Sequence, residues 1–190
     1  MDSDGYLSQL ADIFNGITVN TPSISAIIAI ALAGVLLLAS GFASASEIAF
    51  FSLSPSDRND IDERNHPSDD KISALLGDTE RLLATILITN NFVNVTIIML
   101  CNFFFMNVFV FHSPLAEFLI LTVILTFLLL LFGEIMPKIY SAQKTLAFCR
   151  FSAPGIYFLE KVFRPIATVL VRSTTFLNKH FVKKSHNISV

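Results

Sequence analysis

The sequence has few charged residues for its length. Only 15% of its 190 residues are charged, whereas 53% are hydrophobic and the mean hydropathy is +0.65. Such a composition is too apolar for an ordinary soluble domain with one core, so a membrane domain is indicated. No ionisable side chain stands between Asp12 and Glu47, a stretch longer than the roughly 20 residues that a spanning helix needs.

Cysteine, enzymatic motifs and a basic leader are also scarce or absent. The chain contains no GxSxG, no histidine-rich metal motif and no credible Ser–His pair, so we expect no enzyme. Its two cysteines, Cys101 and Cys149, fall near opposite ends of the predicted membrane layout, which argues against a disulfide. The acidic start and the length of the first apolar run argue against a secretory signal peptide.

The apolar stretches predict three membrane spans, at about 23–50, 82–107 and 115–137. The second lies in a stretch between Arg81 and Glu117 that has only His112 as a titratable group. The third carries LILTVILTFLLLLF between Glu117 and Glu134 and ends at Pro137, which we expect to interrupt the helix. The expected fold class is therefore an all-α integral membrane protein.

The basic residues predict the orientation of these spans. All 13 Lys and Arg residues follow the first span: nine come after the third span, and four stand in the connection between the first two, namely Arg58, Arg64, Lys71 and Arg81. Basic residues near short loops stay on the cytoplasmic side. We therefore expect a multi-pass protein of the cell membrane, with the N-terminus and the turn around 107–114 outside and the C-terminus in the cytoplasm.

The polar segments are predicted to lie on the cytoplasmic side. The connection after the first span reads as a solvated loop with a short helix near 72–76. After Pro137 charges recur about every ten residues, which argues against a fourth span. Amphipathic juxtamembrane helices are expected at about 140–182: a short piece between Pro154 and Pro165, with Arg150, Lys161 and Arg164 near anionic headgroups, and then an interfacial helix. Its one-sided stripe is Ile166, Val169, Leu170, Ser173, Phe176, Leu177 and His180.

Polar side chains inside the spans carry the chemical information, because each needs a partner there. The first span places Ser44, Ser46 and Glu47 near its cytoplasmic end, with Ser40 one turn before Ser44. Serines of this kind commonly bond their own backbone or line helix contacts. Glu47 is expected to serve packing or a salt bridge.

The second and third spans add amides and a carboxylate. Asn90 and Asn94 share one helical face, at about 13 and 20 Å from Arg81 along the axis, and interhelical hydrogen bonding is the alternative explanation for them. Glu134, in GEIMPK, is the strongest single signal, with a salt bridge to Lys138 as its alternative. Together these residues form an all-oxygen set of the kind that hard cations take, and Mg²⁺, Na⁺ and Ca²⁺ all remain open.

SASEIAF in the first span, the asparagine pair and GEIMPK together resemble the membrane domain of the cyclin M (CNNM) and CorC family of magnesium transporters. The resemblance covers nearly the whole chain. It implies a homodimer with three spans per chain, a belt of juxtamembrane helices and a dehydrated Mg²⁺ in an inward-facing cavity. The implied ligands are Ser44, Asn90, Asn94 and Glu134, with Ser46 in reserve for Ser44, and a backbone carbonyl beyond Pro137.

The same resemblance implies a function and partners. We expect a transmembrane domain over 1–182 and a tail over 183–190, in a chain that ends before the cytoplasmic pair of CBS domains found in full-length relatives. The implied activity is Mg²⁺ transport, with export as the expected direction and Na⁺ as the candidate coupling ion. The expected partners are a second copy, the lipid bilayer and CBS domains, but no nucleic acid. The rival hypothesis is a membrane scaffold whose intramembrane polar residues are structural.

Overall fold

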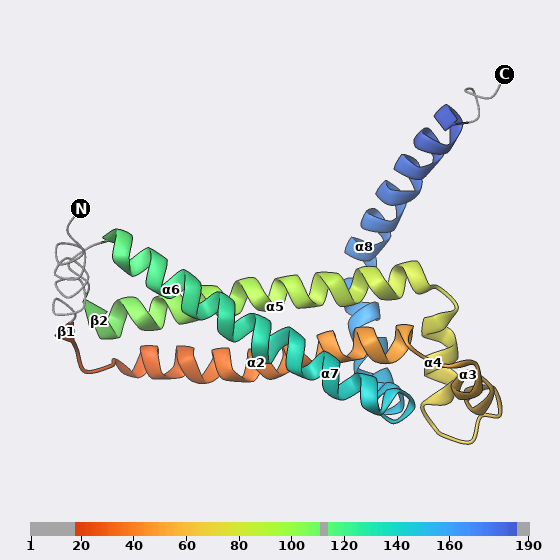
Figure 1. The fold of residues 1–190 in the computed structure, drawn as a ribbon, viewed down its shortest axis with the longest axis horizontal. Coiled ribbons are helices and arrows are strands. Elements are labelled where there is room, and N and C mark those ends of the chain that lie inside the picture. The colour runs from red at the N-terminus through yellow and green to blue at the C-terminus, as the bar shows by residue number, and fades with distance from the viewer. Residues whose placement is uncertain (1–17, 111–113, 186–190) are drawn as a thin grey trace, which may run out of the picture. The chain divides into compact units, whose positions relative to one another are not determined.

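The computed structural model describes the backbone of residues 18–110 and 114–185, and side chains as far as Ser173 except those of Pro114 and Ala116. Almost all of these residues are helical (Figure 1). In chain order the elements are β1 (Thr18–Val19), α2 (Ile24–Phe51), α3 (Pro55–Asp62), α4 (Asp69–Leu76), α5 (Thr79–Val108), β2 (Phe109–Val110), α6 (Pro114–Leu128), a π-helical segment (Leu129–Ile135), α7 (Met136–Gln143) and α8 (Thr145–Ser185).

Three helical stretches within the described residues are long and apolar enough to cross a membrane. They are Ile24–Phe51, Thr79–Val108 and Glu117–Gln143. The all-α membrane fold with three spans that the sequence predicts is therefore confirmed. The third stretch continues beyond its predicted end near residue 137.

The chain divides into two compact units, and the first takes in residues up to Ser40 together with Val93–Ile135. Its buried core consists of small and branched side chains from α2, α5 and the third helical stretch: Ala33, Val93, Ile97, Cys101, Leu125 and Leu129. Strands β1 and β2 pair antiparallel, with Thr18 opposite Val110. This pairing places the segment before α2 beside the residues that follow α5.

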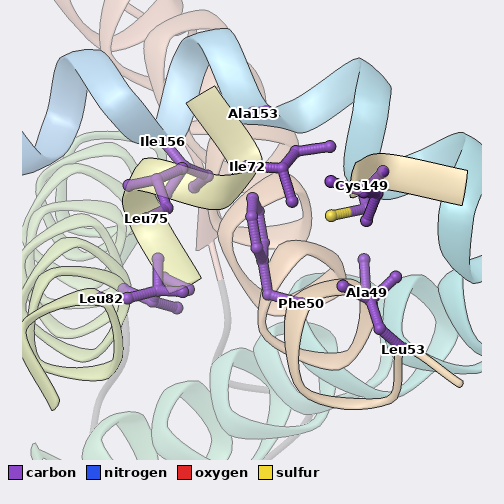
Figure 2. Packing of buried hydrophobic residues seen from close by; sticks show 11 residues of the cluster. Ala49, Phe50, Leu53, Ile72, Leu75, Leu82, Cys149, Ala153 and Ile156 are labelled. Atoms are coloured by element: carbon purple, nitrogen blue, oxygen red, sulfur yellow. The ribbon is translucent and has the colours of Figure 1, made fainter. Parts of the chain in front are cut away.

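The second unit takes in Gly41–Phe92 and the chain from Met136 onward. In its core the Phe50 side chain of α2 lies among residues of α4, α5 and α8 (Figure 2). The residues labelled around it include Ile72, Leu75, Leu82, Cys149, Ala153 and Ile156, all of which are buried. The free thiols of Cys149 and of Cys101 are both buried, and the two cysteines belong to different units.

The connection between the first two spans is more ordered than the predicted solvated loop. The expected helix near 72–76 is α4, and α3 precedes it. Helix α3 begins with Pro55, a residue favoured at the first helical position, and Ser54 and Asp57 make a capping box around it. The Ser54 hydroxyl accepts from Asp57 N at 3.1 Å, and Asp57 Oδ2 accepts from Ser54 N at 2.9 Å. The sequence reasoning missed this signal because it weighed the charges of the segment and not its caps.

The prolines do not break the helices as predicted. The helix passes Pro137 and ends at Gln143, and α8 contains both Pro154 and Pro165 instead of splitting into two pieces. A π-helical segment immediately precedes Met136, and its wider turn leaves room for the Pro137 ring beside the carbonyl four residues earlier, which receives no N–H from the proline. In α8, Ala153 and Ile156 beside Pro154 belong to the buried core, and tertiary packing of this kind can override the low helix propensity of proline.

The apolar stripe of α8 faces outward, as an interfacial helix requires. Ile166, Val169 and Leu170 are all exposed, and Val169 is 65% exposed. The stripe residues Phe176, Leu177 and His180 lie outside the described side chains. A location on the membrane surface remains a prediction for this helix.

Candidate functional site

Three polar side chains of the first unit form a hydrogen-bonded chain across three helical segments. The Ser40 hydroxyl of α2 donates to Asn94 Oδ1 of α5 at 2.7 Å. Asn94 Nδ2 in turn donates to Glu134 Oε1 of the π-helical segment at 3.4 Å. Ser40 is fully buried, while Asn94 and Glu134 are half-buried. The structure thus brings together the asparagine and the carboxylate that the sequence singles out.

The residue before the carboxylate lets the helices approach closely. Gly133 is buried, and a Cβ added to it would lie 3.2 Å from the Ser40 hydroxyl and 3.5 Å from Leu37 Cδ1. Contacts at 3.2 Å are tighter than most Cβ contacts, so any side chain here would press on the serine. Glycine at this position therefore keeps room for the hydrogen-bonded chain.

Glu134 lies in the Leu129–Ile135 segment, which is π-helical throughout. Single π-turns inside α-helices are rare, and they recur at functional sites because the extra residue per turn re-aims side chains and leaves backbone carbonyls unpaired. A carboxylate on such a turn, inside a largely apolar span, fits a ligand-binding role better than a purely packing role.

The other two predicted ligands belong to the second unit. Ser44 follows Ser40 by one turn of α2, and Asn90 precedes Asn94 by one turn of α5. The Ser44 side chain is fully buried, and its hydroxyl makes no hydrogen bond within the described part of the chain. A buried hydroxyl left without a protein partner costs free energy, so it is a natural place for an external ligand. The complete four-residue site remains a prediction.

Two neighbouring residues are accounted for without a ligand. The Ser46 hydroxyl donates to Phe42 O at 2.6 Å within its own helix, which leaves Ser44 as the better candidate of the two serines. Glu47 Oε2 lies 3.0 Å from Lys138 Nζ, which confirms the predicted salt bridge of Glu47. Lys138 thus pairs with Glu47, while Glu134 accepts from Asn94.

The donor atoms favour a hard cation. Among the residues the structure describes, no group of three or more His, Cys, Asp or Glu side chains could hold a metal ion. The hydrogen-bonded chain instead combines one carboxylate with amide and hydroxyl oxygens. Oxygen ligands of this kind suit Mg²⁺, Ca²⁺ or Na⁺ and are poor ligands for soft metals such as Cu(I).

The second unit contains an ion pair that the sequence does not predict. Arg150 of α8 donates from Nε to Asp69 Oδ1 at 2.9 Å and from Nη2 to Oδ2 at 3.0 Å. Arg150 was expected near lipid headgroups, but its guanidinium faces this fully buried carboxylate. Spacing gave no signal, because 81 residues separate the partners. The pair stabilises the packing of α4 against α8.

The electrostatics of this pair follow from its geometry. Burial alone would raise the pKa of Asp69, but the hydrogen bonds from Arg150 and from the His66 amide, with the nearby positive charge, hold it below the ordinary value of 3.8. The hydrogen bond to Asp69 raises the pKa of Arg150 despite the opposing effect of burial. Both groups therefore stay charged at neutral pH.

Ser40 is the site residue that sequence reasoning left out. Its position one turn before Ser44 was visible, but serines in spans usually bond their own backbone. The signal that could have found it is its pairing with Gly133, the small residue beside the carboxylate that allows close approach.

Comparison with known proteins places these residues in a family. The model of the cyclin M transmembrane N-terminal domain matches residues 30–189. A UPF0053 protein of Synechocystis is 26% identical over 140 residues, which are 74% of this chain and 39% of that protein. A UPF0053 protein of Haemophilus influenzae is 29% identical over 136 residues, which are 72% of this chain and 31% of that protein. The match therefore spans between about three and four tenths of the length of these relatives.

Proposed function

Because the chain belongs to the cyclin M transmembrane domain family, we propose that it carries Mg²⁺ across the membrane through a site that includes Asn94 and Glu134. The observation that carries the proposal is the meeting of an amide and the carboxylate of a π-helical turn inside a membrane span. Intramembrane carboxylates are costly and mark ion pathways. A single carboxylate among neutral oxygens attracts Mg²⁺ but neutralises only one of its two charges. Binding of this kind is weak enough to allow the release that transport requires.

The proposed cage also includes Ser44 and Asn90. Each stands one turn from a member of the hydrogen-bonded chain, and the Ser44 hydroxyl is buried without a partner among the described residues. Mg²⁺ takes six oxygens at about 2.1 Å, so four side chains could replace most of its water shell. Backbone carbonyls beside Pro137, or water molecules, would complete the shell.

The proposed mechanism is alternating access. Mg²⁺ sheds water as it enters from the cytoplasmic side, and a rearrangement of the second and third spans then opens the site outward. Export is the proposed direction, and Na⁺ moving inward is the proposed driving ion. We further propose that the transporter is a homodimer in the cell membrane. Because the match covers well under half the length of the relatives, regulation by cytoplasmic CBS domains is also a proposal.

One observation favours a second candidate, a membrane scaffold. The Ser40–Asn94 hydrogen bond joins two helices and would stabilise a bundle without any ion. A scaffold of this kind needs no carboxylate, however, and it would not move ions.

Flux through proteoliposomes tests the proposal directly. We expect vesicles loaded with a Mg²⁺-sensitive dye and containing the protein to report Mg²⁺ entry that Ser44→Ala slows markedly. Ser152→Ala is the matched control: this serine of α8 is also fully buried, but its hydroxyl donates to Cys149 O at 3.3 Å. Vesicles with protein that leak no more Mg²⁺ than empty vesicles would overturn the proposal and favour the scaffold. Mg²⁺ flux in Ser44→Ala equal to that of the parent would show that Ser44 is not a ligand of the proposed site.

A further inference from the structure

The Asn94 amide uses both of its ends in the structure. Its oxygen accepts from the Ser40 hydroxyl at 2.7 Å, and its nitrogen donates toward Glu134 Oε1 at 3.4 Å. The amide N–H group therefore faces the carboxylate, and the amide oxygen points to the opposite neighbour. In this arrangement the amide dipole compensates part of the carboxylate charge.

This orientation is the reverse of the one a cation needs. An ion held by Glu134 and Asn94 together must meet the amide oxygen, because an N–H group repels a cation. The amide would have to rotate by roughly 180° about its terminal torsion, which is broad and close to two-fold in energy. After rotation, the nitrogen would face Ser40.

We propose that the Asn94 amide reverses when the cation binds, and that Ser40 is the positioning residue that supports both orientations. This inference rests on the proposed Mg²⁺ site. A serine hydroxyl both donates and accepts. It donates to the amide oxygen in the cation-free state, and it accepts from the amide nitrogen in the cation-bound state. Only the hydroxyl hydrogen moves on the serine, so Ser40 is not itself a ligand.

The surroundings of Ser40 make the hydroxyl hard to replace. Its side chain is 0% exposed, and Gly133 approaches so closely that an added Cβ would lie 3.2 Å from the hydroxyl oxygen. A water molecule has little room to take over both roles. Alanine at this position would leave the amide oxygen unpaired in the free state and the amide nitrogen unpaired in the bound state. Orphaned N–H groups are the costlier of the two, so the loss falls on the bound state.

Two measurements on the purified chain in detergent test the inference. Calorimetric titration with Mg²⁺ should give a Kd about fivefold higher for Ser40→Ala than for the parent, which corresponds to about 1 kcal/mol. Ser152→Ala should keep the parent's Kd. Infrared difference spectra of ¹³C-asparagine-labelled protein should show a Mg²⁺-induced shift of one side-chain carbonyl band, assigned to Asn94 because that band is missing from the Mg²⁺-free spectrum of Asn94→Ala. A purely structural serine would lower the melting temperature without changing the Kd or the band.

The outcomes separate this inference from the proposed function. If the parent binds Mg²⁺ but Ser40→Ala has the same Kd, or the Asn94 band does not move, the amide reversal is wrong and the Mg²⁺ site stands. If the parent shows no Mg²⁺ binding, the proposed function is wrong and the reversal falls with it.

Discussion

Replacing Glu134 by glutamine removes the charge from the candidate site and keeps its shape. The glutamine carbonyl can still accept the hydrogen bond that Asn94 Nδ2 makes to Glu134 Oε1 at 3.4 Å. That bond loses its charge assistance, so we expect folding stability to change by only about 1 kcal/mol. The effect on a bound cation should be much larger, because Glu134 is the only carboxylate in the proposed ligand set.

The magnitude follows from removing one partner of a poorly solvated charge pair. Such removal typically costs about 3 to 5 kcal/mol, since the remaining charge is left without compensation. That free energy corresponds to roughly a 100-fold to 4,000-fold rise in the Kd for Mg²⁺. The second charge of Mg²⁺ strengthens its attraction to the carboxylate, but the cost of removing its water opposes that gain. We therefore keep the range of free energies that applies to pairs of single charges.

The assay is calorimetric titration of Mg²⁺ into parent and variant in the same detergent. Glu47→Gln is the matched control, because it makes the same chemical change at a carboxylate that pairs with Lys138 at 3.0 Å. With both partners about one-third exposed, that pair should contribute at most about 1 kcal/mol to stability. Its loss should leave the Kd unchanged. A Glu134→Gln protein that binds Mg²⁺ as tightly as the parent would refute the reasoning.

Three further predictions concern packing and charge. Gly133→Ala should lower the melting temperature and weaken Mg²⁺ binding because its Cβ would press on a serine hydroxyl 3.2 Å away, whereas Gly34→Ala, with nothing within 4 Å, should be neutral or stabilising in a thermal melt. Asp69→Asn should cost about 1.5 to 3 kcal/mol because it removes the negative charge and one of the two carboxylate oxygens that accept from Arg150. The pKa of Asp69 is lower in the folded than in the unfolded state, so its charged form stabilises the fold above about pH 4, and this stability is lost as the pH falls through the folded pKa. In an acid titration monitored by circular dichroism, Asp69→Asn should therefore lack this pH-dependent part of the stability. Burial, with the nearby Asp69 charge, raises the pKa of Cys149 to about 12, so a maleimide at pH 8 should label this thiol only after unfolding; rapid labelling of the folded protein would contradict the packing.

The spans and the contact between Asn94 and Glu134 could be predicted because they depend on local patterns. Charge-free stretches delimit helices regardless of what packs on them, and the i, i+4 spacing of Asn90 and Asn94 sets their shared face. The meeting of Asn94 with Glu134 followed from their similar expected depth in the membrane. Local rules sufficed here because a polar side chain in a span must find another polar side chain.

The missed features depend on contacts between distant segments. Nothing in the sequence near Asp69 points to Arg150, because the pair forms only when α4 packs on α8. The interrupted helices expected at Pro154 and Pro165 failed for a related reason: tertiary packing outweighed the local cost of proline. Ser40 was passed over because the choice between bonding its own backbone and bonding Asn94 is made by the neighbouring helix.

A Mg²⁺ site at Asn94 and Glu134 should show in the melting temperature of the chain in detergent across a Mg²⁺ titration, with Na⁺ and Ca²⁺ titrated in parallel. A ligand at 100 times its Kd stabilises the folded state by about 2.7 kcal/mol, which for a chain of this size is a rise of roughly 5 to 10 °C. We expect a rise of that size for Mg²⁺ in the parent and no rise in Glu134→Gln. A parent whose melting temperature does not change with Mg²⁺ would contradict an ion site at Asn94 and Glu134. The hydrogen-bonded chain would then serve only to hold the helices together.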